Sequence, residues 1–141
     1  MQSTAEGMQG TGGRTAALIG GDVVALMVFA AIGRGSHGEA AGLGAIGEVA
    51  QTAAPFIIGW LVTSPWLGAF RRASTDTPVK MLRTTAIAWC AGVLVGALVR
   101  ALMIGRFSPP SFYMVTFIAA LVLLGSWRTA FATWDARRFG L

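Results

Sequence analysis

Residues 52–70, TAAPFIIGWLVTSPWLGAF, constrain the fold more than any other part of the chain, because this apolar stretch of 19 residues has no charged side chain. A helix of that length rises about 28 Å and nearly crosses the ~30 Å hydrocarbon core of a bilayer. Pro55 and Pro65 interrupt the stretch, and each proline leaves a backbone carbonyl without its usual intrahelical donor. Such a carbonyl needs another partner within a membrane, so we expect this helix to lie inside a bundle.

The composition is typical of an integral membrane protein. Hydrophobic residues make up 55% of the 141 residues and charged residues only 12%, whereas soluble domains contain about a quarter charged residues. We therefore expect one membrane bundle surrounded by lipid bilayer, without a separate soluble domain. The net charge is +5, and most cations lie at the ends of apolar spans, where topology and anionic headgroups explain them. No basic face with interleaved aromatic residues is present, so no nucleic-acid partner is expected.

Four apolar segments predict an all-α membrane protein with four transmembrane helices. The expected spans are about 15–32, 52–70, 84–104 and 112–129. They form a single domain over residues 15–130, with a disordered tail at 1–14 and a second tail at 131–141. A secretory signal is the alternative for the first span, but a signal has an apolar region of only ~7–15 residues. The first span is longer and contains Asp22, which favours a retained helix.

The distribution of cations predicts the orientation. The N-terminal tail, the loop after the second span and the C-terminal end hold eight cations, whereas the other two loops hold only Arg34 and Arg106. The eight are Arg14, Arg71, Arg72, Lys80, Arg83, Arg128, Arg137 and Arg138. By the positive-inside rule, both termini are expected to be cytoplasmic, with the protein in the cell inner membrane.

A faint internal repeat is visible in the sequence. Residues 25–36 and 97–108 are identical at six of twelve aligned positions. Such a repeat predicts two hairpins in the same orientation, as in transporters with parallel repeats. Chance similarity in a sequence rich in Ala, Leu and Gly is the alternative.

Asp22 is the strongest candidate for a polar site within the membrane. It lies seven residues into the first span, which is about 10 Å from the cytoplasmic edge. An ionised carboxylate at that depth requires a partner, or it must be protonated. Arg128 belongs to the same side of the membrane. Two interpretations remain open: a clamp between helices, or a carboxylate that carries a proton or a cation.

A second group of polar residues is expected on the opposite side. Arg100, near the end of the third span, either extends toward the headgroups or pairs with Glu48. Together with Arg34 and His37, this pair would line an outward-facing vestibule. We expect no metal site, since His37 is the only histidine and Glu39 lies too close in sequence to be a convincing second ligand.

Helix packing is expected to depend on small residues and prolines in the second and third spans. Gly92 and Gly96 have the small-xxx-small spacing that lets two helix backbones approach closely. The corresponding residues of the second span are Pro55, Gly59, Trp60 and Pro65.

Several short motifs follow one another in a characteristic order. They are Asp22, Gly33-Arg34 with His37, Pro55-Phe56, Gly59-Trp60, Arg100 and Trp127-Arg128. In this order the chain resembles an uncharacterised family of small four-helix prokaryotic membrane proteins, catalogued as a domain of unknown function. The resemblance covers about residues 15–130. It implies a fold of four membrane helices and supplies no activity.

The sequence predicts no enzyme and no cofactor. It has no nucleophile–base pair, phosphate-binding glycine loop or zinc-ligand spacing, and aromatic residues within spans more often pack than bind a pigment or quinone. Two functional classes remain. The first is a transporter or channel for a small solute, an ion or a proton, expected to act as a dimer. The second is an accessory or scaffold subunit of a membrane complex that binds protein, lipid or pigment.

Overall fold

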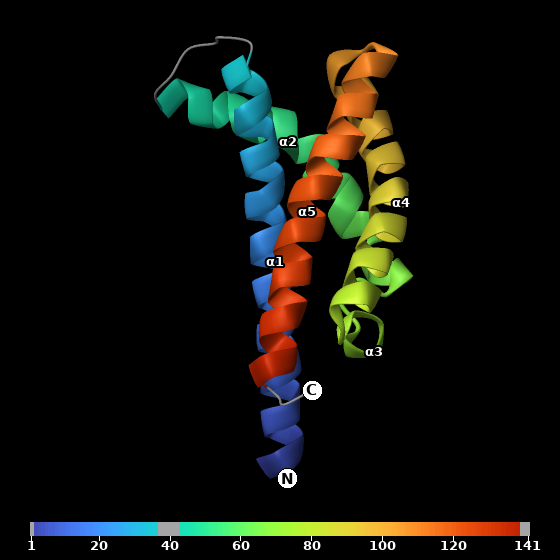
Figure 1. Cartoon of the computed structure of the whole chain (residues 1–141). Helices are drawn as coiled ribbons and strands as arrows, with labels where there is room; N and C mark the ends of the chain where they lie inside the picture. Colours follow the sequence, from blue (N-terminus) through green and yellow to red (C-terminus); the bar gives the residue numbers. More distant parts are fainter. Residues whose placement is uncertain (1, 37–42, 139–141) are drawn as a thin grey trace.

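The computed structural model describes residues 2–36 and 43–138, which fold into four long helices and two short ones (Figure 1). The elements are α1 (Gln2–Ser36), α2 (Leu43–Thr63), η1 (Pro65–Leu67), α3 (Arg72–Thr75), α4 (Pro78–Ile104) and α5 (Pro110–Arg138). Figure 1 shows α1 and α4 running in one direction and α5 in the other, with α2 crossing the bundle obliquely from the end of α1 down toward the start of α4. The α1–α2 and α4–α5 hairpins therefore have the same orientation, and α1 begins at the end of the bundle where α5 finishes.

Within the described residues, three helical segments are long and apolar enough to cross a membrane: Gly12–Gly33, Pro78–Ile104 and Pro110–Arg137. A further apolar helical segment, Val49–Thr63, is shorter. The all-α fold with several candidate membrane helices is thus confirmed. The first, third and fourth expected spans lie within α1, α4 and α5.

The second expected span, 52–70, differs because it is not one helix. α2 ends at Thr63, and Pro65 begins the 3₁₀ turn η1. A proline lacks the N–H that the helical ladder requires, and its ring clashes with the preceding turn. Gly68 then adopts a φ of 82°, a left-handed conformation that only glycine adopts without a steric cost. The last part of this apolar stretch is therefore an irregular turn rather than the end of a membrane helix.

The first and last helices extend beyond the expected spans. α1 is already helical at Gln2, where the sequence predicts a disordered tail, and α5 continues to Arg138 through most of the expected C-terminal tail. No proline occurs within either extension to interrupt the helix. Arg14 and Asp135, which lie on these extensions, are both buried and contact each other, so the two helix ends hold each other in place.

α2 and α4 cross with their backbones in contact at three glycines. A Cβ atom at Gly59 would collide with the carbonyl oxygen of Gly92 and would lie 2.6 Å from the backbone nitrogen of Gly96. A Cβ at Gly96 would lie 2.7 Å from Cδ1 of Phe56. Real Cβ atoms do not approach backbone atoms this closely, so this crossing depends on the missing side chains.

Aromatic rings fill the core around this crossing. The Phe56 ring lies 6.5 Å from Phe29, 6.4 Å from Trp89 and 6.2 Å from Phe112, measured between centroids. The Trp89 indole also donates a hydrogen bond to the Phe117 carbonyl of α5 at 3.1 Å. These contacts join α1, α2, α4 and α5 into one core, which leaves the apolar outer surfaces of the helices free to face lipid.

Candidate functional site

A buried ion pair between α1 and α5 is the centre of the candidate site. Arg128 Nη2 donates to Asp22 Oδ2 at 2.6 Å, and Arg128 Nε donates to Asp22 Oδ1 at 2.8 Å. Both side chains have 0% exposure. This parallel two-bond geometry is the strongest form of an arginine–carboxylate contact. The structure therefore brings together the two residues that the sequence places on one side of the membrane.

Asp22 lies on a continuous buried face of α1. Leu18 and Leu26, one turn before and one turn after Asp22, are fully buried on the same face. The neighbouring Gly21 allows α5 to come close, because a Cβ atom there would overlap the Trp127 indole. A larger residue at position 21 would thus separate α1 from α5 beside the ion pair.

Two indole groups complete the hydrogen bonding of Asp22. Trp60 Nε1 donates to Oδ2 at 2.9 Å, and Trp127 Nε1 donates to Oδ1 at 3.2 Å. With the two bonds from Arg128, the carboxylate accepts four hydrogen bonds, which is about the number of lone-pair sites that it offers. All four hydrogen bonds come from N–H donors on three residues, so donors surround both carboxyl oxygens of Asp22.

Arg128 has its own set of contacts on the side away from Asp22. Its Nη1 donates to the Ala69 carbonyl at 2.7 Å and lies 3.6 Å from the Met81 sulfur. The guanidinium carbon lies 5.0 Å from the ring centroids of both Trp60 and Phe70. Aromatic faces attract such a cation, and more strongly when water is excluded. The site therefore joins α1, α5, α2, α4 and the irregular turn before α3.

A second ion pair joins the same two helices about two turns away. Arg14 Nε donates to Asp135 Oδ2 at 3.0 Å, and both side chains are buried. The other guanidinium nitrogens of Arg14 donate to the hydroxyl and the carbonyl of Thr75, each at 2.9 Å. Arg72 adds a half-exposed contact to Asp135 at 3.3 Å. Both α1 and α5 thus contribute one acid and one arginine to the two ion pairs.

Sequence reasoning missed this second ion pair, since it places Arg14 and Asp135 in the two tails. The spacing of the charged residues along the two helices could have indicated this ion pair. Arg14 precedes Asp22 by eight residues on α1, and Arg128 precedes Asp135 by seven on α5. Both spacings return to the same face of a helix after about two turns. In antiparallel neighbours, this places each arginine opposite an acid.

Arg100 does not belong to the site. Its Nε donates to Ser108 Oγ at 3.1 Å, and its guanidinium lies 4.4 Å from the centroid of the Phe112 ring. These contacts stay at the end of the α4–α5 hairpin. The expected partner Glu48 and the vestibule residues Arg34 and His37 lie outside the residues or side chains that the structure describes.

Two buried hydroxyl groups, one of them beside the irregular turn, lack a protein partner. Ser64 Oγ, at the end of α2, and Thr85 Oγ1, on α4, make no hydrogen bond among the described residues. A buried hydroxyl without a partner is costly, and an ordered water commonly satisfies it. In the described part of the chain, no group of three or more histidine, cysteine or acidic side chains could hold a metal ion.

Comparison with known proteins identifies a family and no closer relative. A family model described as "Protein of unknown function (DUF3054)" matches residues 19–131, in agreement with the resemblance seen in the sequence motifs. No curated protein and no solved structure matches the chain. The matched range contains Asp22 and Arg128, whereas Arg14 and Asp135 lie just outside it.

Proposed function

We propose that this chain, which belongs to the DUF3054 family of proteins of unknown function, is a non-catalytic accessory or scaffold subunit of a membrane complex. The observation that supports this role is the environment of Asp22. Its carboxylate is fully buried and accepts four hydrogen bonds. A carboxylate that carries protons or cations must exchange them with water, and in this conformation no acceptor site is left for one.

The energetic cost of the site also favours a structural role. Removing a buried charge pair from water is expensive, and the pair recovers that cost only when its remaining donors and acceptors are satisfied. Here Asp22, Arg128 and the Trp60 indole satisfy one another. Such a closed network stabilises one arrangement of helices, which suits a subunit that presents fixed outer surfaces to its partners.

The proposed topology has four membrane segments, with both termini in the cytoplasm of a cell whose inner membrane holds the protein. α2 is the shortest of the four, and its 21 residues from Leu43 to Thr63 rise about 31 Å. Arg14 and Arg128 are buried in the bundle and so leave the count of loop cations. Six of the original eight then remain on the proposed cytoplasmic side against two on the other, and the bias keeps its direction.

Reconstitution and native extraction test the proposed role together. The purified chain is reconstituted into lipid vesicles, and a membrane potential is imposed. If the chain is a scaffold, proton and potassium flux should not exceed the flux into vesicles without protein. Extraction of the native membrane without detergent should yield a particle that contains a second protein at a fixed ratio. Flux that scales with protein content and disappears in the double variant Asp22→Asn with Arg128→Gln, while the helical circular dichroism is retained, would overturn the proposal.

A transporter is the second candidate, and the partnerless hydroxyls of Ser64 and Thr85 favour it. Buried polar atoms beside a broken helix are the type of site at which transporters bind ions and small solutes. In that case the single variants Ser64→Ala and Thr85→Val should reduce flux in the vesicle assay and leave thermal stability unchanged. Absence of flux from the wild-type chain rejects this candidate.

A further inference from the structure

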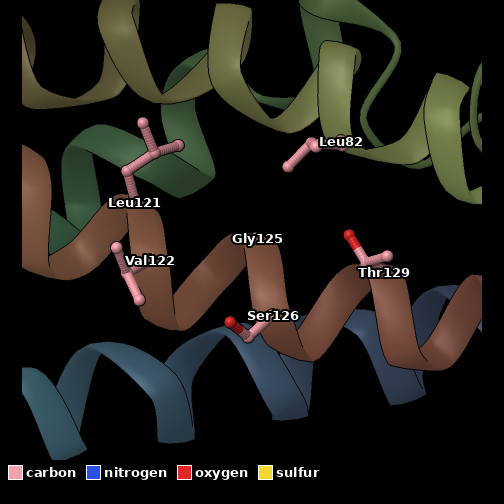
Figure 2. A pocket seen from close by; sticks show the side chains of 6 residues that line it. All are labelled: Leu82, Leu121, Val122, Gly125, Ser126 and Thr129. Atoms are coloured by element: carbon pink, nitrogen blue, oxygen red, sulfur yellow. The ribbon is translucent and has the colours of Figure 1, made fainter.

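A shallow groove opens on the outer surface between α4 and α5, and none of the four ion-paired residues lines it. Its volume is about 400 Å³, and it is lined by Leu82 of α4 and by Leu121, Val122, Gly125, Ser126 and Thr129 of α5. Figure 2 shows Leu82 reaching toward α5, with Leu121 near one end of the groove and Thr129 near the other. Leu82 is 48% exposed and Val122 is 60% exposed, so the groove faces outward.

Small residues on α5 create this groove. Gly125 lies opposite Leu82, and a Cβ atom at position 125 would already lie 3.2 Å from Leu82 Cδ1. Ser126 and Thr129 are also small, so α5 does not fill the space beneath Leu82. An apolar hollow on a membrane-facing surface loses dispersion contacts unless something fills it. In a bilayer, the molecules available at this depth are lipid acyl chains.

The groove is long enough for part of one leaflet. Val122 and Thr129 are seven residues apart on α5, which is about 10 Å along the helix axis. Half of a ~30 Å hydrocarbon core is about 15 Å. The groove therefore accommodates part of one acyl chain lying along the helices.

Charge is arranged around only one end of the groove. Arg83 follows Leu82 directly on α4 and is exposed, and in the described part of the chain no hydrogen-bond or ion-pair partner is found for it. Arg137 is exposed two turns beyond Thr129 on α5. Toward the other end, α4 carries no charged residue before Arg100. An apolar groove with cations at its cytoplasmic-side end matches a lipid that has an acyl chain and an anionic headgroup.

We propose that the groove between α4 and α5 binds an acyl chain of an anionic phospholipid whose phosphate contacts Arg83. The site requires α4 and α5 to lie in a bilayer, and it does not depend on the scaffold role. A second copy of the chain is a poorer occupant. A two-fold interface places the same surface of both copies together, so both copies would bring an Arg83 to one interface and add like charges there.

Native mass spectrometry of the full chain in mild detergent tests the proposal. The probes are dioleoyl phosphatidylglycerol, which is anionic, and dioleoyl phosphatidylcholine, which is neutral overall and has the same acyl chains. The wild-type chain should retain the anionic lipid more tightly. Arg83→Gln should weaken that binding about fivefold, as expected for one surface cation. It should weaken retention of the neutral lipid less, because the choline cation of that lipid already offsets its phosphate charge. The matched control is Arg106→Gln, which removes an exposed cation from the opposite end of the helices.

A second pair of variants tests the groove itself. Gly125→Leu fills the groove and should reduce retention of both lipids, whereas Gly20→Leu introduces the same side chain where no atom lies within 4 Å and should not. Ser126→Phe fills the groove from its exposed side, so it provides the test if Gly125→Leu fails to fold. Lipid retention unchanged in the groove variant, or equal losses in Arg83→Gln and Arg106→Gln, would refute the site. A wild-type dimer that Ser126→Phe dissociates would assign the groove to self-association instead.

Discussion

Neutralising the two partners of the buried ion pair separately and together should reveal how strongly they are coupled. Arg128→Gln removes both bonds to Asp22 and leaves the carboxylate buried with only two indole donors. Asp22→Asn leaves the guanidinium with the Ala69 carbonyl, the Met81 sulfur and the single amide oxygen of the new side chain. It also turns the amide N–H₂ toward one indole N–H and one guanidinium N–H. Each single variant thus leaves a buried charge without its counter-ion.

The magnitude follows from that uncompensated charge. Breaking a buried ion pair by removal of one partner costs about 3–5 kcal/mol in the free energy of unfolding. The double variant contains no buried charge at this position, and its two amides can bond to each other. Its cost should therefore be smaller than the sum of the two single costs by about 2–3 kcal/mol.

Equilibrium unfolding in mixed micelles measures these values, with Trp fluorescence and circular dichroism as the two signals. Trp60 and Trp127 report on the site because both indoles bond to Asp22. The control cycle uses Asp76 and Lys80, a half-exposed i,i+4 pair at 3.2 Å, for which a coupling of about 0.5 kcal/mol is expected. A coupling for the buried pair no larger than that of the control pair would refute the reasoning.

Three further predictions concern packing, backbone and topology. Gly96→Leu should lower the thermal stability strongly, because even a Cβ atom there would lie 2.7 Å from Phe56. The control Gly20→Leu places the same side chain in open space and should leave the stability unchanged. Equal effects of the two variants would mean that the α2–α4 crossing is not close. Pro65→Ala should lower stability despite the better helix propensity of alanine, because it favours extension of α2 through the turn that supplies the Ala69 carbonyl; a stability gain would contradict this. In a cysteine-free background, Ser111→Cys should react with an impermeant thiol reagent in intact cells and Ala73→Cys should not, and the reverse result would invert the proposed topology.

Much of the helical fold was predictable because hydrophobicity and length alone specify membrane helices. The ion pair between Asp22 and Arg128 could also be predicted, because a carboxylate within a membrane span needs a partner. The helical extensions were not, because residues 1–14 are polar and rich in glycine, and their sequence resembles a tail. The burial of Arg14 depends on Asp135 and Thr75, which lie 121 and 61 residues away, and no local pattern reports such contacts.

The break in the second apolar stretch and the buried ion pair depend on each other. A guanidinium carries five N–H donors, and Asp22 accepts from only two of the Arg128 nitrogens. In a continuous helix, the Ala69 carbonyl would be occupied by the amide four residues later. Because α2 stops before Pro65 and the chain turns, this carbonyl instead faces Arg128 at 2.7 Å. The proline that shortens a membrane helix thus provides the acceptor that allows an arginine to be buried inside the bundle.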